Sequence, residues 1–260
     1  MNASPEKSAG AAAGGASTLV KGQSAPRYGY RVRFAKTGDL RLISHRDLLR
    51  LLERLFRRAG IGLSMSEGFH PKPRYRVTAA LALGVAGLNE VLELDLAEPL
   101  DAAELLASLR GQAPPGLSFH TAEPLPPLYR AAVAQRLHYE LPVPAQRQAA
   151  AVEAVKQLLA GGAAEMATPA ALTPDKLALV EHLQIDGGVL HATLCAGQQA
   201  GLRPRDLLAA LGLDDLETYG SYLTRTGVEL ESEMTETTFE SPKVCHDVDV
   251  AAASTVSGES

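Results

Sequence analysis

Apolar and polar residues alternate along Tyr28–Ala35, where Tyr30, Val32 and Phe34 share one side and arginines occupy the other. This period of two residues predicts a strand with one buried face. Leu40–Ile43 follows a turn, and it either extends the strand or leads directly into a helix. The same kind of pattern predicts three more strands, over residues 74–83, 91–96 and 117–122.

The spacing of leucines changes to three and four residues after Ser44, which predicts an amphipathic helix over His45–Ala59. Ser44 and Asp47 have the spacing of a capping box at its start, and Gly60 ends it. A shorter helix is predicted over Asp101–Leu109. The resulting order, β-α-β-β-α-β, is that of a ferredoxin-like unit.

A weaker version of the same order follows in the second half of the chain. Strands over Leu177–Ile185 and Val189–Leu194 are joined by Asp186-Gly187-Gly188, a hairpin turn signal. The helix over Pro204–Leu211 has proline at its start, where the missing N–H costs nothing. The other expected parts are a strand over 136–143, a helix over 145–160, an Ala- and Pro-rich insertion over 161–174 and a last strand over 218–230.

The sequence therefore predicts an α+β protein of two tandem ferredoxin-like (βαββαβ) halves. The basic first half covers 27–125 and the second covers 126–230, and the Pro-rich stretch Pro124–Leu128 joins them. Residues 1–26 are rich in Ala, Gly and Ser, and residues 231–260 are acidic and aperiodic. Both are expected to be disordered tails, because they cannot bury enough apolar surface to offset the entropy of ordering.

Bulk composition narrows the class of protein. A hydrophobic content of 46% with 21% charged residues is typical of globular chains. Aromatic residues make up only 5%, so extended stacking platforms for single-stranded bases are not expected. Two distant cysteines, Cys195 and Cys245, make neither a disulfide framework nor a metal cluster. We expect a cytoplasmic protein with no membrane partner, because no apolar run reaches transmembrane length and no signal-peptide pattern is present.

Positive charge is concentrated near one end of the chain. Residues 27–76 hold thirteen Lys and Arg against four Asp and Glu, in a chain whose net charge is −5. Such segregation predicts a cationic surface, whose partners would be phosphates or an acidic protein. The candidate anion- or nucleic-acid-binding residues are Arg31, Arg33, Arg46, Arg50, Arg54, Arg57, His70, Lys72, Arg74 and Arg76.

The four helix arginines in this set are spaced four, four and three residues apart and so form a stripe. One interpretation is an ordinary solvated helix surface, stabilised by Glu53. The other is phosphate binding, for which clustered arginines supply bidentate, salt-dependent contacts. Phosphate binding is favoured, because the flanking strand and loop are basic as well.

The loop Glu67–Pro73 is the most distinctive local motif. Gly68 permits unusual backbone angles, and Pro71 and Pro73 stiffen the exit. The loop could be only a fixed crossing between strands. It could instead present His70, Lys72 and Arg74 to a ligand, as rigid loops with polar side chains often do.

Ser44, His45 and Asp47 are close enough in sequence to resemble a catalytic set, but helix capping explains Ser44 and Asp47. The helix dipole disfavours protonation of His45, and a neutral imidazole there could serve as an acid–base group. The remaining histidines lack the spacing of metal ligands on a helix. No metal and no cofactor are predicted. These histidines are His120, His138, His182, His191 and His246.

Several short motifs resemble those of a bacterial family of radical SAM-linked domains, a family of unknown function. They are F-A-K-T-G-D, S-H-x-D, R-R-A-G and S-E-G-F-H-P-K-P, all within residues 28–125. L-R-P-R-D-L-L near 202–208 and L-T-R-T-G near 223–227 fit more loosely. Members are fused to, or encoded beside, a radical SAM protein with a cobalamin-binding domain, so the resemblance implies a radical SAM partner. This chain lacks the three close cysteines that hold a [4Fe–4S] cluster.

We therefore expect a non-catalytic accessory or substrate-binding protein, which holds RNA or another phosphate-rich substrate for a radical SAM enzyme. One alternative is an RNA-processing or RNA-modifying enzyme that uses His45 or His70 as its acid–base group. Tandem ferredoxin-like endonucleases that process CRISPR transcripts have this architecture, but their Gly-rich loop near the C-terminus is missing here. The other alternative is an interaction module that docks an acidic protein.

Overall fold

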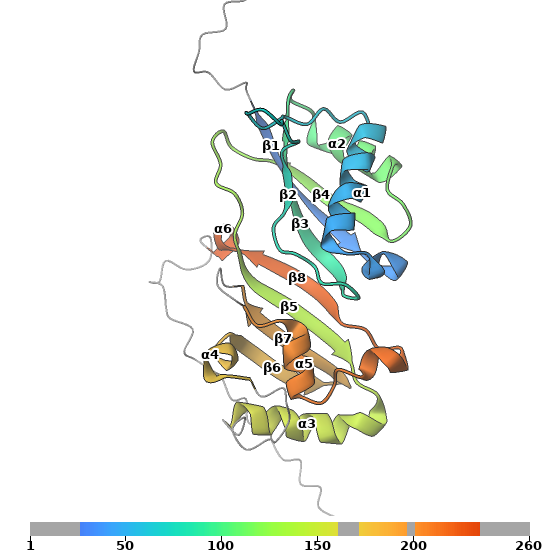
Figure 1. The fold of residues 1–260 in the computed structure, drawn as a ribbon, viewed down its shortest axis with the longest axis vertical. Helices are drawn as coiled ribbons and strands as arrows, with labels where there is room; N and C mark the ends of the chain where they lie inside the picture. Colours follow the sequence, from blue (N-terminus) through green and yellow to red (C-terminus); the bar gives the residue numbers. More distant parts are fainter. Residues whose placement is uncertain (1–26, 161–171, 197–200, 235–260) are drawn as a thin grey trace, which may run out of the picture.

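The computed structural model describes residues 27–160, 172–196 and 201–234, which form a mixed α+β fold around an eight-stranded sheet (Figure 1). The strand order is β4-β1-β3-β8-β5-β7-β6, and β2 also pairs with β3. The predicted tail 1–26 and most of the insertion 161–174 lie outside the described residues. The strands are β1 (Tyr28–Lys36), β2 (Tyr75–Val77), β3 (Ala86–Leu96), β4 (Leu117–Pro124), β5 (Ala134–Pro142), β6 (Val180–Asp186), β7 (Val189–Cys195) and β8 (Thr224–Leu230).

In the first half, β1 lies between β3 and β4 and is antiparallel to both. The predicted alternation of β1 is confirmed, because Tyr30, Val32 and Phe34 are buried. Helices α1 (His45–Arg58) and α2 (Ala102–Gly111) pack on that apolar side of the sheet, and their leucines complete the core. The other side of β1, which carries the arginines, therefore faces away from both helices.

In the second half, β5 lies between β8 and β7, and β6 follows β7, all antiparallel. Helices α3 (Ala145–Leu159) and α5 (Pro204–Ala210) bury their leucines against this part of the sheet. The predicted hairpin turn between β6 and β7 is confirmed. Gly187 and Gly188 adopt φ of 55° and 79°, which a side chain would disfavour.

Each half has its own main apolar core, and the two halves share one sheet, because β3 and β8 pair in parallel. Leu81 and Val85 of the first half pack into the core of the second. Ala86 lies opposite Thr224, and Gly87 lies opposite Arg225. The remainder of the same β3 edge pairs with β2. Figure 1 shows the halves one above the other, with β3 and β8 between them.

Three strand boundaries differ most from the sequence prediction. β2 ends at Val77 rather than at Leu83, because the carbonyls of Ala79 and Ala80 turn to accept hydrogen bonds from Arg225. β3 starts at Ala86 rather than at Val91, and its first residues pair with β8. β8 starts at Thr224 rather than at 218, since a 3-10 turn occupies Leu216–Tyr219.

The short connecting elements were harder to predict. The segment after β1 is a 3-10 turn, Gly38–Leu42, so it leads into α1 and does not extend the strand. A short helix α4 (Pro174–Leu177) has no counterpart in the prediction. Residues 231–234, expected to begin a disordered tail, form the helical turn α6 (Glu231–Met234). The rest of that tail lies outside the described residues. Within the described ranges, no helix combines the length and apolar character needed to cross a membrane.

Candidate functional site

Helix α1 begins with the predicted Ser44 cap, which the structure confirms. The Ser44 hydroxyl oxygen accepts a hydrogen bond from the Asp47 amide at 3.2 Å. The same hydroxyl donates to the Asp47 carboxylate at 2.6 Å. The Ser44 hydroxyl and the nearby Arg50 guanidinium therefore hold the pKa of Asp47 below its usual range. Ser44 and Asp47 thus have a structural role at the start of α1.

The arginine stripe of α1 is exposed. Leu48, Leu52, Leu55 and Phe56 bury the opposite face of the helix, which directs the arginines into solvent. Arg50 forms a 3.4 Å ion pair with Asp47, three residues away. Over the part of the chain that the structure describes, the other three arginines of the stripe form no ion pair. The stripe consists of Arg46, Arg50, Arg54 and Arg57.

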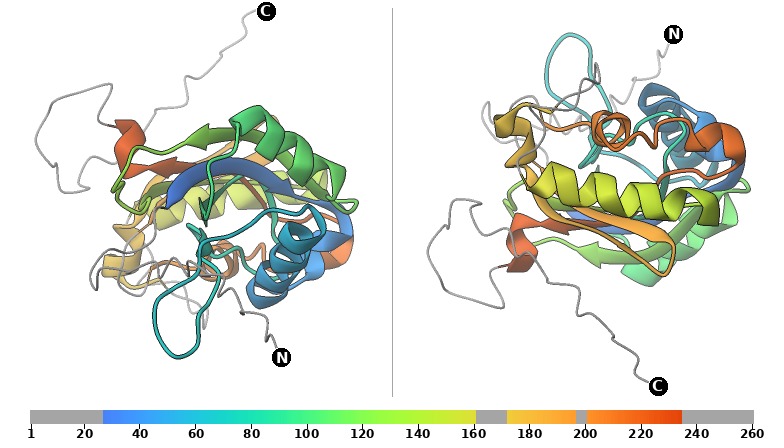
Figure 2. Two further views of the ribbon diagram at one scale, coloured as in Figure 1. Left: turned by 90° about the horizontal axis from the view of Figure 1, so that it is seen from above. Right: turned by 90° about the horizontal axis from the view of Figure 1, so that it is seen from below.

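A two-stranded arm, residues 63–74, projects beside α1 (Figure 2). Ser66 N donates to the Lys72 carbonyl, and Arg74 N donates to the Ser64 carbonyl, each at 2.8 Å. The Ser66 hydroxyl also accepts from Lys72 N at 2.9 Å. Gly68 has φ of 122°, a conformation available to glycine, so its predicted role is confirmed. The loop expected over 67–73 is therefore the tip of an ordered hairpin.

The predicted polar side chains of the arm differ in exposure. His70 and Lys72 are exposed, and Arg74 is half-buried and donates to the Met65 carbonyl at 3.3 Å. At the base of the arm, the Tyr75 hydroxyl donates to the Leu49 carbonyl of α1 at 2.9 Å.

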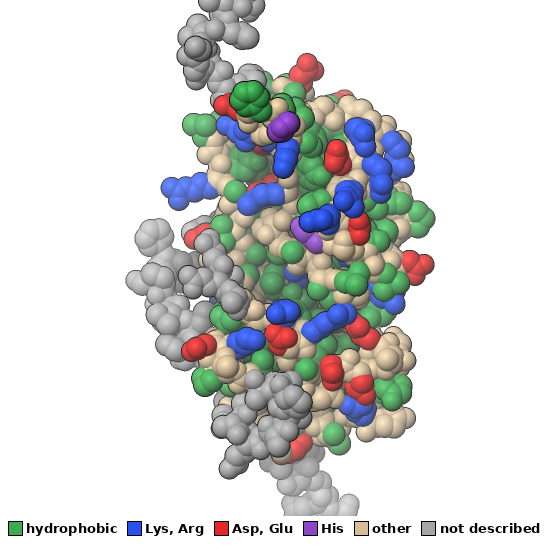
Figure 3. Space-filling model, in the orientation of Figure 1, with side chains coloured by type: hydrophobic (Ala, Val, Ile, Leu, Met, Phe, Trp, Pro, Cys, Tyr) green, Lys and Arg blue, Asp and Glu red, His purple; other side chains and the backbone are tan. Residues whose placement is uncertain are grey.

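Cationic side chains gather over α1 and around the arm on one side of the molecule (Figure 3). We call this surface the basic face. It comprises Arg46, Arg50, Arg54, Arg57, His70, Lys72 and Arg74.

The other three predicted anion-binding residues lie on the opposite side of the sheet. Arg31 and Arg76 each approach Glu93 to 3.0 Å, and Glu93 is only 2% exposed. Arg33 donates to the Val228 carbonyl at 2.8 Å and pairs with Glu233 of α6. These arginines balance a buried acid and attach α6, so the structure does not bring them together with the basic face.

Sequence reasoning missed a buried polar cluster between the halves. Arg225 is 1% exposed, and its Nε lies 2.8 Å from Oε1 of the equally buried Glu90. Arg225 also donates to the carbonyls of Ala79 and Ala80, at 2.9 and 3.2 Å. Lys36 is fully buried, and its Nζ donates to a carbonyl of the segment before α1 at 3.2 Å. No local pattern distinguishes Lys36 and Glu90 from the other charged residues of β1 and β3.

His45 borders this cluster. Its Nδ1 is buried and finds no hydrogen-bond partner among the described residues. Burial lowers the pKa of His45, and the neighbouring positive charges of Lys36 and Arg225 lower it further, while Glu90 opposes them. A neutral His45 was expected from the helix dipole, but burial is the larger cause. Burial also lowers the pKa of Lys36.

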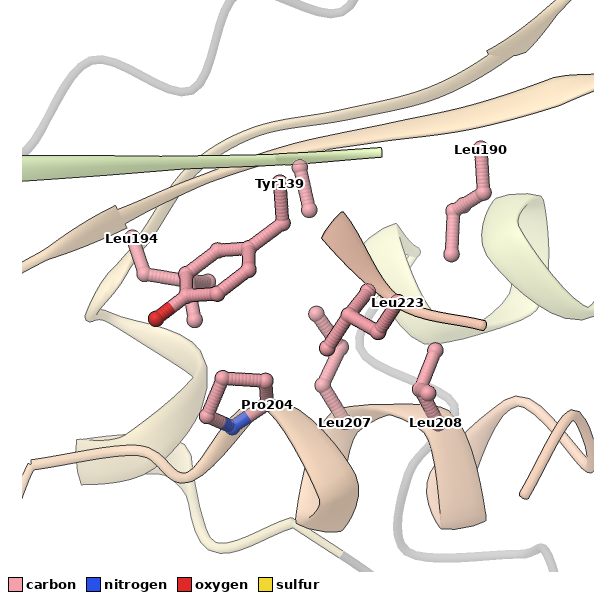
Figure 4. Close-up of a pocket in the computed structure, with 8 residues that line it drawn as sticks. Tyr139, Leu190, Leu194, Pro204, Leu207, Leu208 and Leu223 are labelled. Carbon is pink, nitrogen blue, oxygen red and sulfur yellow. The ribbon is translucent and has the colours of Figure 1, made fainter. Parts of the chain in front are cut away.

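Two hollows occur in the second half. The first is an apolar void of about 10 Å³, where Leu207 and Leu208 of α5 face Tyr139 and Leu223 (Figure 4). A void of this size and lining is a packing gap. The second, of about 290 Å³, lies on the helix-free side of the sheet and is lined by His138, His182 and His191, among others.

Two of the three histidines of the second hollow already have partners. His138 Nε2 lies 2.9 Å from Glu229, and His138 Nδ1 lies 3.1 Å from the Thr193 hydroxyl. His191 Nδ1 lies 3.5 Å from Glu140. Across the described ranges, no group of three His, Cys, Asp or Glu side chains is arranged to hold a metal ion.

Comparison with known proteins gives one family match. A family model described as "Uncharacterized protein conserved in bacteria (DUF2344)" matches residues 29–204. No curated protein matches the chain. A solved structure, "Crystal Structure of an Unknown Protein from Galdieria sulphuraria", aligns with 12% identity over 79% of this chain and 99% of that chain. Its TM-score of 0.25 is too low to establish a shared fold.

Proposed function

The chain belongs to the uncharacterized bacterial family DUF2344, and we propose that it is an accessory protein that binds RNA or another phosphate-rich substrate through its basic face. The observation that carries this proposal is the set of exposed arginines on α1 without ion-pair partners in the described structure. An arginine whose charge is not already balanced binds phosphate without first losing a protein carboxylate.

The basic face also has the extent that a chain of phosphates requires. α1 has fourteen residues and therefore spans about 21 Å at 1.5 Å per residue, and the stripe follows most of it. The arm adds His70 and Lys72 beside the helix. Phosphates follow one another at regular intervals along a nucleic acid, so a row of cations suits RNA better than a single small anion.

We also infer that each half is a ferredoxin-like unit. Numbered within its own half, each set of strands has the order 4-1-3-2 with every neighbour antiparallel. Helices pack on one side of the sheet in both halves. These features support the tandem ferredoxin-like arrangement that the sequence suggests.

The proposed partner is a radical SAM enzyme. The resemblance of residues 28–125 to radical SAM-linked domains supports this part of the proposal. With two cysteines fifty residues apart in sequence, the chain would contribute substrate binding while the partner supplies the radical chemistry.

One observation favours a second candidate, an RNA-modifying enzyme that uses His45. Its buried Nδ1 has no hydrogen-bond partner among the described residues, and its lowered pKa keeps the imidazole neutral and able to accept a proton. His70, the other histidine considered, is exposed near the tip of the arm. To test this candidate, the wild type and His45→Gln are each incubated with cellular RNA, and cleaved or modified products are sought. We expect products with the wild type and none with His45→Gln.

The binding proposal is tested by titrating labelled single-stranded RNA at several salt concentrations. We expect log affinity to fall linearly with log salt, and Arg54→Ala with Arg57→Ala to reduce the slope by about 1.4, since each lost phosphate contact contributes about 0.7. The matched control is Arg130→Ala with Arg203→Ala, which removes the same charge from exposed positions outside the basic face. Affinity that is indifferent to salt, or an equal loss in the control, would contradict the proposal. Binding of an acidic peptide in preference to RNA would favour protein docking instead.

A further inference from the structure

Phe69, at the tip of the arm, is the most exposed large apolar side chain of the described structure, with a relative exposure of 103%. Leu128, in the linker between the halves, is nearly as exposed at 95%. Exposure alone therefore does not distinguish Phe69, since single apolar residues at protein surfaces are common. The structure of the arm below Phe69 and the side chains near it do distinguish Phe69 from Leu128.

The base of the tip that carries Phe69 is hydrogen-bonded. Ser66 N donates to the Lys72 carbonyl, and Lys72 N donates to the Ser66 hydroxyl. Gly68 provides the positive φ of the turn, and Pro71 fixes the backbone on the other side of the tip. The phenyl ring is fully exposed and contributes nothing to the buried core.

The neighbours of Phe69 are polar. His70 follows it directly, the exposed Lys72 lies two residues further along the arm, and the exposed Glu67 lies two residues before Phe69. The arm itself is tied to α1 through Tyr75, so the ring is at one end of the basic face. A polyanion attracted to this face would bring its own groups to the ring, whereas an apolar protein pocket would have to accept the charged side chains of Glu67 and Lys72 near it.

We propose that Phe69 stacks on an unpaired base of the RNA bound to the basic face, so that the substrate class is single-stranded RNA or an RNA loop. The proposal rests on the proposed function and specifies its substrate. In a duplex, both faces of each base are occupied by neighbouring base pairs. In a single strand or loop, a base is free to stack on an aromatic side chain. Such stacking is tolerant of sequence and acts together with backbone contacts from cationic residues.

The experiment uses the full chain and single-stranded RNA that contains 2-aminopurine, whose fluorescence changes when the base stacks on a new partner. We expect Phe69→Ala and Phe69→Leu to weaken binding roughly tenfold and to abolish the fluorescence change. Phe69→Tyr should retain both, because it keeps the ring. Leu128→Ala is the matched control, which removes an equally exposed apolar side chain outside the basic face, and it should bind like the wild type.

Two further measurements separate stacking from the proposed function. Duplex RNA of the same sequence should bind Phe69→Ala as it binds the wild type, and the salt dependence on single strands should be unchanged in Phe69→Ala. Salt-dependent binding of single strands that is indifferent to Phe69→Ala overturns the stacking proposal alone. Retention of affinity in Phe69→Leu also overturns it, since any apolar side chain would then suffice, as expected for a protein pocket. Failure of the wild type to bind RNA overturns both proposals.

Discussion

Arg225 Nε lies 2.8 Å from Glu90 Oε1 in a buried ion pair between residues 135 positions apart in sequence. The pair lies beside the short parallel pairing of β3 and β8, where the two halves meet. Arg225 also holds the carbonyls of Ala79 and Ala80, which ends β2. One side chain thus joins the sheet of the second half to a strand end in the first.

Arg225→Ala should destabilise the fold by about 3–5 kcal/mol, because it leaves the Glu90 carboxylate buried without a partner. Urea denaturation measures the loss. Arg225→Met combined with Glu90→Leu should recover part of it, since the uncompensated charge is gone although two backbone carbonyls still lack donors. A loss below about 1 kcal/mol in the single variant would mean that water reaches Glu90.

His45 should make the protein less stable as pH falls. Its pKa in the folded state is lower than the ordinary value of 6.5, so the unfolded chain takes up the proton first. The contribution of His45 to the free energy of unfolding is complete above pH 6.5, and it is lost as pH falls below that value toward the folded pKa. NMR titration of the His45 ring gives the folded pKa directly. In urea denaturation near pH 6, His45→Gln should make the free energy of unfolding depend less on pH. A folded pKa above 6.5 would contradict the burial of this group beside Lys36 and Arg225.

Ser44→Ala should cost about 1 kcal/mol of unfolding free energy, because the Asp47 amide loses its cap. Ser44→Thr should retain most of the stability, since it keeps the hydroxyl that donates to the Asp47 carboxylate. Ser44→Asp should lose part of it, because two carboxylates would then face each other at 44 and 47. Thermal denaturation in the same buffer ranks the three variants. Equal stability of Ser44→Ala and Ser44→Thr would exclude a capping role for the Ser44 hydroxyl.

His70→Ala with Lys72→Ala should weaken RNA binding while changing stability by less than about 0.5 kcal/mol, because both side chains are exposed. Gly68→Ala provides the contrast. It strains a backbone with φ of 122° and should disturb the arm itself. If the double variant unfolds, or binds RNA as tightly as the parent, the arm serves only as a support.

Local patterns in the sequence predicted the elements that depend on near neighbours. The period of β1, the cap of α1 and the glycine turn between β6 and β7 each depend on a few adjacent residues. The start of β3 and the end of β2 could not be predicted in this way. Both depend on β8 and Arg225, more than 130 residues further along the chain.

The candidate site shows the same division. A count of charges along residues 27–76 treats all cations alike, and so it included Arg31 with the arginines of α1. The alternation of β1 held the missing information, because a helix that covers the side of Tyr30 and Val32 leaves Arg31 on the other side. Burial of Lys36 could not be read from the same count, since it depends on packing between the halves.

The short pairing of β3 with β8 also has a consequence for synthesis on the ribosome. The strands and helices of the first half emerge before any of the second, and N-terminal units generally fold first. Until Arg225 is made, however, Glu90 has no guanidinium opposite it and the edge of β3 at Ala86 and Gly87 has no neighbour. The first half therefore reaches its final form only when the last strand of the second half has been translated.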